Sequence, residues 1–123
     1  MDQLSIALND DRTVFAPGAE IRGTITWRCD ANPQLLELSL FWYTAGKGTR
    51  DVGVVETKRF EEPGAHGSKD FAFTLPAGPY SFSGKLISLL WALELTSSPG
   101  AEIVRREITV SPTGQEILLG EVR

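Results

Sequence analysis

Few residues in this chain carry side chains suited to catalysis or metal binding, and they are scattered. His66 is the single histidine and Cys29 the single cysteine among 123 residues. His66 stands in a glycine-rich stretch without a fixed acid, base or nucleophile beside it, so Ser/His/Asp or Cys/His chemistry is not predicted. One cysteine and one histidine cannot complete a zinc site, and a lone cysteine cannot form an intrachain disulfide. We therefore expect no enzyme activity.

Acidic residues gather at two places. Asn9-Asp10-Asp11 offers oxygen ligands for calcium, but the glycine and the final glutamate of a helix-loop-helix site are missing. Glu56, Glu61 and Glu62 could supply the paired carboxylates of a glycosidase. Charges at strand ends are more commonly solvated, so we interpret both groups as surface charge and expect no metal and no cofactor.

Two further features superficially suggest phosphate or acidic ligands. Gly46-Lys47-Gly48-Thr49 lacks the first glycine of a phosphate loop, because Phe41 occupies that position, and we interpret it as a hairpin turn. Arg105-Arg106 with Arg22 and Arg28 could form a basic strip, although we interpret them as a solvated strand face. The net charge of −4, with both signs interleaved, argues against nucleic acid as the main partner.

The elements that must position these residues are strands. Apolar and polar residues alternate with a period of two, and Pro, Gly, Asn and Asp separate the alternating segments. The predicted strands are Leu4–Leu8, Thr13–Phe15, Glu20–Arg28, Leu35–Thr44, Asp51–Glu61, Phe71–Leu75, Ile87–Leu95 and Glu102–Val110. Roughly seven or eight strands without a helical period indicate an all-β, immunoglobulin-like sandwich. We expect one domain over residues 1–123, with a short apolar tail at 115–123.

The most strongly patterned part of the chain is Phe71–Leu95. Pro76 ends the first strand of this part, and we expect the two strands to form a central hairpin, with Ile87 among the inward residues. We interpret Pro63–Gly67 as the loop that leads into this hairpin. In the last long strand Arg106 shares the parity of apolar neighbours, so it must lie near an edge or find a partner.

Two stretches resemble the arrestin-like fold family. Phe15–Ile25, reading FAPGAEIRGTI, is similar to the family's aromatic-x-Pro-Gly entry into its second long strand. Phe73-Thr74-Leu75-Pro76, followed by Pro79–Gly84 and Ile87–Trp91, resembles the family's Phe-x-Leu-Pro corner and the strand after it. The resemblance spans about residues 3–111. It implies a sandwich used for protein binding, as in arrestins, the related retromer subunit and bacterial sporulation-control proteins.

This sequence also departs from the family pattern. Members usually carry two such sandwiches, and this chain has one. Arrestins read phosphorylated receptors with paired basic residues near the amino end, where Asp10 and Asp11 stand here. The resemblance therefore implies an adaptor or regulator, but neither phosphate sensing nor any single binding residue.

Apolar residues of outward parity are the candidates for binding a partner. Leu35, Phe41 and Tyr43 in one predicted strand, and Leu86 and Leu90 in another, should lie on outer faces. Apolar clusters of that kind mark interfaces. The tail residues Ile117, Leu118 and Leu119 could cover them or add a strand to an edge.

We therefore predict a non-catalytic, cytoplasmic protein-interaction or adaptor module. It would bind a partner protein, or a second copy as a homo-oligomer, through edge strands or the outer apolar patch. The alternative is a carbohydrate- or small-ligand-binding sandwich in which Tyr43 and Tyr80 stack on sugar rings. No membrane insertion is expected, because the apolar run Leu86–Leu95 is shorter than the ~20 residues of a spanning helix.

Overall fold

The chain folds into two facing β-sheets. The computed structural model describes residues 3–46, 50–84, 86–99, 102–113 and 117–118. Its strands are β1 (Gln3–Leu8), β2 (Val14–Phe15), β3 (Glu20–Arg28), β4 (Leu35–Gly46), β5 (Val52–Glu61), β6 (His66–Thr74), β7 (Phe82–Ser83), β8 (Ile87–Ser98), β9 (Ile103–Val110) and β10 (Ile117–Leu118). A short 3-10 turn, η1, covers Asn9–Asp11. The prediction of an all-β sandwich is confirmed.

The first sheet has the antiparallel order β1-β3-β6. β3 alternates buried and exposed side chains along its length, as its sequence predicts. Gly23 is needed at its centre, because a Cβ there would overlap the Ala7 carbonyl oxygen and the Phe71 ring. This glycine lets the three strands approach closely where β1 and β6 flank β3.

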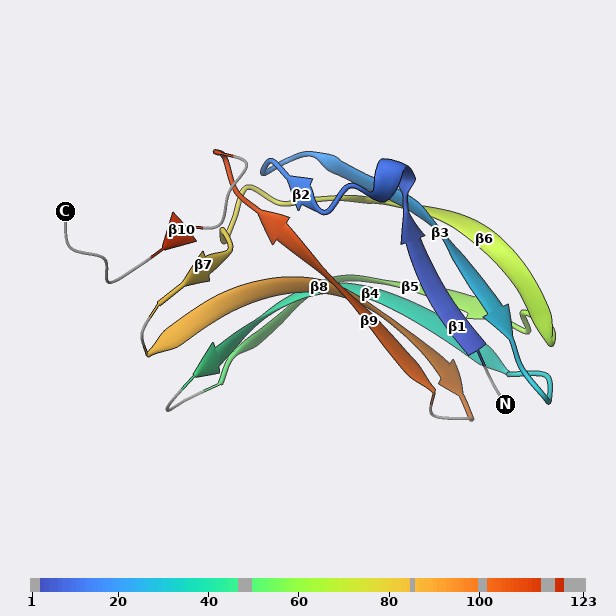
Figure 1. The fold of residues 1–123 in the computed structure, drawn as a ribbon. Coiled ribbons are helices and arrows are strands. Elements are labelled where there is room, and N and C mark those ends of the chain that lie inside the picture. Colours follow the sequence, from blue (N-terminus) through green and yellow to red (C-terminus); the bar gives the residue numbers. More distant parts are fainter. Residues whose placement is uncertain (1–2, 47–49, 85, 100–101, 114–116, 119–123) are drawn as a thin grey trace.

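The second sheet has the order β10-β7-β8-β4-β5, and β9 pairs with β8 and β2. Its long central pair is β4 with β8, in register from Leu35 opposite Ser98 to Gly46 opposite Ile87. Figure 1 shows β4, β5 and β8 arching, with the hollow side turned away from β1, β3 and β6. We call this hollow side the outer face of the second sheet.

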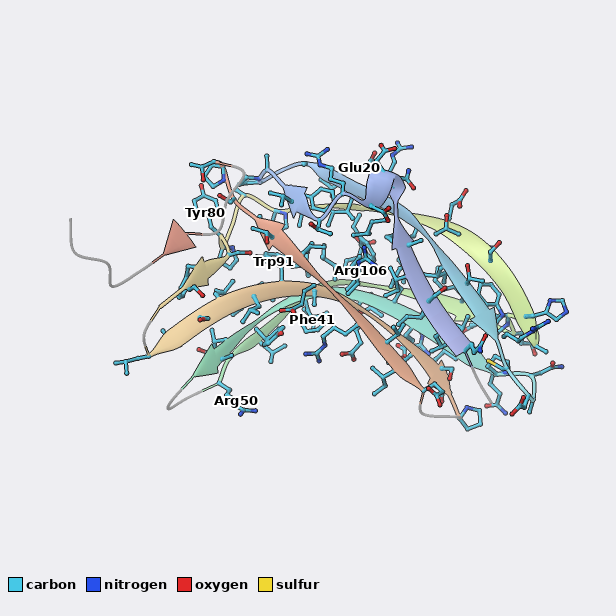
Figure 2. The ribbon with its side chains drawn as sticks, viewed as in Figure 1. Glu20, Phe41, Arg50, Tyr80, Trp91 and Arg106 are labelled. Carbon is cyan, nitrogen blue, oxygen red and sulfur yellow. The ribbon has the colours of Figure 1, made fainter. Side chains whose placement is uncertain are left out.

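The apolar core fills the space between the two sheets. Figure 2 shows Trp91 on the inner side of the arch and Phe41 on the outer side. The Trp91 indole is completely buried, and its Nε1 donates a hydrogen bond to the Pro79 carbonyl oxygen at 2.9 Å. The largest fully buried apolar side chains are Trp91, Phe73, Ile21, Ile25, Leu36, Leu38, Leu40, Leu75, Leu93, Leu95 and Val110.

Three sequence expectations require correction. The predicted hairpin of Phe71–Leu95 does not form, because β6 pairs with β3 in one sheet and β8 pairs with β4 in the other. The proline-rich connection crosses between the sheets instead of reversing within one. β6 begins at His66, inside the predicted loop, because residues 66–70 continue the ladder with β3. Ile87 is exposed, since it begins β8 at the margin of the sheet.

Arg106 lies on the inward side of β9. Figure 2 places it between the two layers, and it is half-buried. β9 pairs with β8 along one side at this position, and no other described strand pairs with its second side there. Arg106 therefore lies near a sheet edge, as we expected from its position among inward-facing residues in the sequence.

Candidate functional site

The outer face of the second sheet carries the largest share of the predicted partner-binding residues. Phe41 on β4 stands opposite Ala92 of β8 and Val54 of β5. Two positions along, Tyr43 stands opposite Leu90 and Val52. Side chains of such cross-strand pairs share one face of a sheet. The pairing therefore gathers aromatic and aliphatic groups from β4, β5 and β8.

A β-bulge puts the β5 valines on this face. The ladder between β4 and β5 runs from Leu40 opposite Glu56 to Phe41 opposite Val54, which leaves Val55 as an extra residue. A bulge reverses the parity of the residues that follow it. Val52 and Val54 consequently face outward, with 64% and 61% of their surface exposed. Sequence reasoning missed both valines, although the weak alternation of Asp51–Glu61 was a signal of the bulge.

Gly53 holds this end of β5 against β4. The side chain at position 53 would point inward, where the Trp42 indole covers the backbone, and a Cβ would overlap the ring. The indole can therefore lie flat against β5 only because residue 53 has no side chain. This contact fixes the strand whose neighbouring residues, Val52 and Val54, point outward.

Arg105 organises the aromatic part of the face. Its guanidinium carbon lies 5.1 Å from the Phe41 ring centroid and 5.1 Å from the Tyr43 ring centroid. The two rings are themselves 5.8 Å apart between centroids. Attraction of a guanidinium to ring faces is a cation–π interaction. Arg105 therefore lies over both rings on the outer side of the sheet.

Glu94 fixes the Arg105 side chain. Nη2 and Nε of Arg105 donate hydrogen bonds to Glu94 Oε2 at 2.8 and 3.2 Å. The hydrogen bond with Glu94 is the main cause that raises the pKa of Arg105 above its ordinary value, with a smaller contribution from Tyr43. The hydroxyl of Tyr43 also lies 3.5 Å from Glu107 Oε1. Arg105 is thus paired locally with Glu94, and its guanidinium remains protonated at any physiological pH.

These residues line a cavity of about 500 Å³ that we call the outer groove. Its lining combines apolar side chains of β4 and β5 with polar and charged ones, namely Ser39, Thr44, Arg50, Glu94 and Arg105. The residues that define it are Phe41, Tyr43, Val52, Val54, Glu94 and Arg105. A concave surface that combines apolar side chains with a few placed polar groups is a typical binding site.

The predicted partner-binding residues have different surroundings. Phe41 faces outward as expected but is only 7% exposed, because Arg105 covers its ring; the expectation that it is unburied is therefore wrong. Tyr43, Leu35 and Leu90 are half-buried on β4 and β8. Leu86 is 69% exposed just before β8 and does not line the outer groove.

The tail contributes a short strand. Ile117–Leu118 form β10, which pairs in parallel with Phe82–Ser83 of β7 at the far edge of the second sheet. Leu119 lies outside the described residues, as do the side chains of β10. The order of strands separates β10 from β4 and β5, so the backbone of this strand does not run along the outer groove.

The residues considered for catalysis are not brought together. His66 is exposed at the start of β6, and the shallow hollow beside it is lined by Gln3, Thr26, Trp27, Arg28 and Gly67, without an acidic group. Cys29 is buried after β3. Glu56 pairs with Lys58 at 2.9 Å on the inward side of β5, whereas Glu61 faces outward. Within the described ranges no three His, Cys, Asp or Glu side chains cluster as metal ligands.

The suggested basic strip does not form either. Arg22 and Arg28 belong to β3 in the first sheet, whereas Arg105 and Arg106 belong to β9 in the second. Arg105 faces outward over the aromatic rings and Arg106 faces inward, as neighbours in a strand must. Of the turn Gly46–Thr49, residues 47–49 lie outside the described part.

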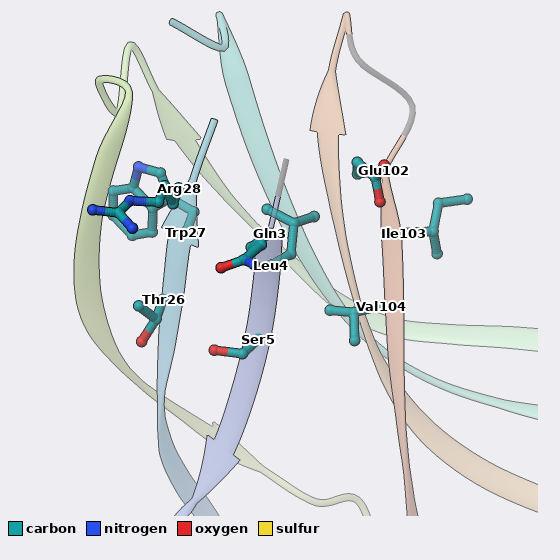
Figure 3. Close-up of a pocket in the computed structure, with 9 residues that line it drawn as sticks. All are labelled: Gln3, Leu4, Ser5, Thr26, Trp27, Arg28, Glu102, Ile103 and Val104. Atoms are coloured by element: carbon teal, nitrogen blue, oxygen red, sulfur yellow. The ribbon is translucent and has the colours of Figure 1, made fainter. Parts of the chain in front are cut away.

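A second hollow separates the two sheets at their open side. Figure 3 shows it between β1 and β9, with Leu4 and Val104 facing each other across it. Its volume is about 430 Å³, and its walls include Gln3, Ser5, Thr26 and Glu102. A larger share of its lining is polar than in the outer groove, and none of the predicted partner-binding residues lines it.

The aromatic residues do not form a platform for a sugar. Trp91 is fully buried and Trp42 packs against the core beneath β5. Tyr43 lies in the outer groove under Arg105, while Tyr80 stands in the connection before β7 and does not line that groove.

The described residues include no helix long and apolar enough to cross a membrane.

Comparison with known proteins identifies the fold. No protein-family model matches the sequence, and no curated protein matches it. Among solved structures the chain is similar to Spo0M, a sporulation control protein from Bacillus subtilis, with a TM-score of 0.62 and 19% identity. The match covers 89% of this chain and 49% of that one, so this chain spans about half the length of Spo0M. The arrestin-like fold expected from the sequence is confirmed.

The chain is also similar, with lower TM-scores, to solved structures of two enzymes. A β-glucosidase from Listeria innocua matches with a TM-score of 0.50 and 14% identity, over 96% of this chain and 16% of that one. A superoxide reductase, neelaredoxin, from Ignicoccus hospitalis matches with a TM-score of 0.51 and 14% identity, over 89% of this chain and 80% of that one. At such identities these likenesses describe the sandwich alone.

Proposed function

We propose that this chain is a non-catalytic protein-binding module of the adaptor or regulator type, and that it receives its partner in the outer groove. The observation that carries the proposal is the arrangement of Arg105 over Phe41 and Tyr43 beside two exposed valines. Aromatic residues and arginine are enriched where proteins bind one another. The similarity to a sporulation control protein supports a regulatory role.

The groove suits an apolar side chain carried on an extended or helical segment. Val52 and Val54 provide the accessible apolar surface, because Phe41 is covered by the guanidinium. Glu94 and Arg105 neutralise each other, and Arg50 adds one positive charge to the lining of the groove. A partner with one or two large apolar anchors fits these features best.

Selection of peptides from a random library on the immobilised chain tests this proposal. Peptides that bind the groove should lose at least roughly tenfold in affinity for Val52→Lys, because a charge would replace the accessible apolar surface. Leu86→Lys is the matched control, since Leu86 is equally exposed but lies outside the groove. Equal losses in both variants, or peptides that are insensitive to Val52→Lys, would reject the groove as the binding site.

A further inference from the structure

The far side of β5 is an open sheet edge. β5 is the last strand in the order of the second sheet, and no other described strand pairs with its second side. An open edge presents backbone N–H and C=O groups that can pair with another strand. The strand is ten residues long and carries Val52, Val54 and Val55 among its exposed residues, so it is a favourable template.

Along β5, the backbone groups of alternate residues point toward β4 and toward the open edge. The N–H of Glu62 donates to the Gln34 carbonyl at 2.9 Å, on the side of β4. Backbone groups alternate in direction along a strand. Between Glu56 and Glu61, where the ladder is regular, Lys58 and Phe60 therefore bond toward β4. Thr57 and Arg59 present their N–H and C=O groups to the open edge.

The charges on β5 restrict which strand can pair there. In an antiparallel pair of identical strands related by a two-fold axis, the residue on the axis faces its own copy. An axis at Glu56 or at Lys58 would place like charges opposite each other, which is unfavourable. An axis at Thr57 places each Glu56 opposite Lys58 of the second copy. In this register both charged pairs become attractive.

The same register suits the neighbouring positions. Val54 and the bulged Val55 occupy one ladder position, which faces Arg59 of the second copy. The aliphatic stem of an arginine can cover such valines while its charged end stays in water. On the axis, the two Thr57 residues exchange both backbone hydrogen bonds. Threonine pairs of this kind are favourable across strands.

We propose that β5 pairs antiparallel with β5 of a second copy, with the two-fold axis at Thr57. The second sheets of the two copies then form one continuous sheet. This inference goes beyond the proposed function, because the partner is identical and the surface is the edge of β5 instead of the outer groove. Charged residues on an edge usually oppose pairing. Here they oppose pairing with the axis at Glu56, Lys58 or Arg59, and they favour the register in which Glu56 meets Lys58.

Sedimentation equilibrium on the wild-type chain and on charge variants tests the pairing. The wild type should form a dimer whose dissociation constant is below about 1 mM. Glu56→Lys or Lys58→Glu alone should weaken association by roughly tenfold, because each places like charges opposite each other. A mixture of the two variants should associate as a heterodimer, since every facing pair is then opposite in charge. Neither single variant retains the Glu56–Lys58 pair within its own chain, so recovery in the mixture reports pairing between chains.

Two further variants distinguish pairing at the β5 edge from nonspecific hydrophobic association. Val54→Lys should weaken the dimer, since it faces Arg59 of the second copy. Ile103→Lys should leave it unchanged, because Ile103 is also 61% exposed but belongs to β9. A monomer at all concentrations, or a mixture that does not associate, would overturn the proposed pairing. Peptide binding by that monomer would leave the proposed function standing.

Discussion

Arg105 lies over the ring of Phe41, with 5.1 Å between the guanidinium carbon and the ring centroid, and closes the ring off from solvent. β9 and β4 are not neighbours in the sheet, since β8 runs between them. The long arginine side chain spans this intervening strand. The outer face therefore combines a covered aromatic pair with exposed valines, and both depend on strands that are distant in sequence.

Replacing Arg105 with alanine should destabilise the fold and expose the aromatic pair. The loss combines an exposed ion pair with cation–π contacts, so we expect the free energy of unfolding to fall by about 1 kcal/mol. Urea denaturation measures this change, and binding of a hydrophobic dye should rise. Arg28→Ala is the control, because Arg28 is exposed on β3 and is not in contact with these rings. Equal stability of Arg105→Ala and the wild type would contradict the covering role.

Gly53→Ala should disturb the contact of β4 with β5. The added methyl would overlap the Trp42 indole, and the strain should lower the free energy of unfolding by about 1–3 kcal/mol. Thermal unfolding measures the stability, and the NMR resonance of the Trp42 indole N–H reports the environment of the ring. Gly78→Ala is the matched control, since a Cβ at Gly78 meets no atom within 4 Å. If the two variants melt alike, the proposed packing of Trp42 on Gly53 is wrong.

Two buried serines should respond differently to alanine. Ser81 Oγ accepts a hydrogen bond from the Val110 N–H at 2.9 Å, so Ser81→Ala strands a buried donor and should cost about 1–3 kcal/mol. Ser97 Oγ is buried and has no hydrogen-bond partner among the residues that the structure describes. Removing it should leave stability unchanged or raise it by about 1 kcal/mol. Chemical denaturation measures the free energy of unfolding of both variants. A Ser97→Ala variant as unstable as Ser81→Ala would refute the contrast.

The covering of Phe41 and Tyr43 should be insensitive to pH across the neutral and mildly alkaline range. The pKa of Arg105 is raised in the folded state, chiefly by its hydrogen bond with Glu94. A raised pKa of a cation contributes stability that is complete below the unfolded pKa and is lost only as pH rises through the folded value. Ring-proton shifts of Phe41 and Tyr43 should thus stay constant between about pH 7 and pH 9, because the guanidinium keeps its charge throughout this range. Movement of both rings in that range would show that another group controls the contact.

The sequence by itself determined the fold class and most of the core. Alternation along β3, β4 and β8 identified inward residues such as Ile25, Leu38 and Trp91, because a strand with one buried face must repeat every two residues. Turn residues such as Pro17-Gly18 marked strand ends by their restricted backbone. The resemblance to arrestin-like proteins supplied the topology class, which periodicity cannot give.

Only the tertiary structure decided which strands pair and what lies on the outer face. Period-2 patterns do not say which sheet a strand joins, and for this reason Phe71–Leu95 suggested a hairpin where the chain crosses between sheets. The bulge at Val55 reversed the parity of β5 and brought Val52 and Val54 beside Phe41 and Tyr43. Arg105 reached these rings through a side chain long enough to cross β8. Each of these outcomes depends on contacts between residues far apart in sequence, which local patterns do not encode.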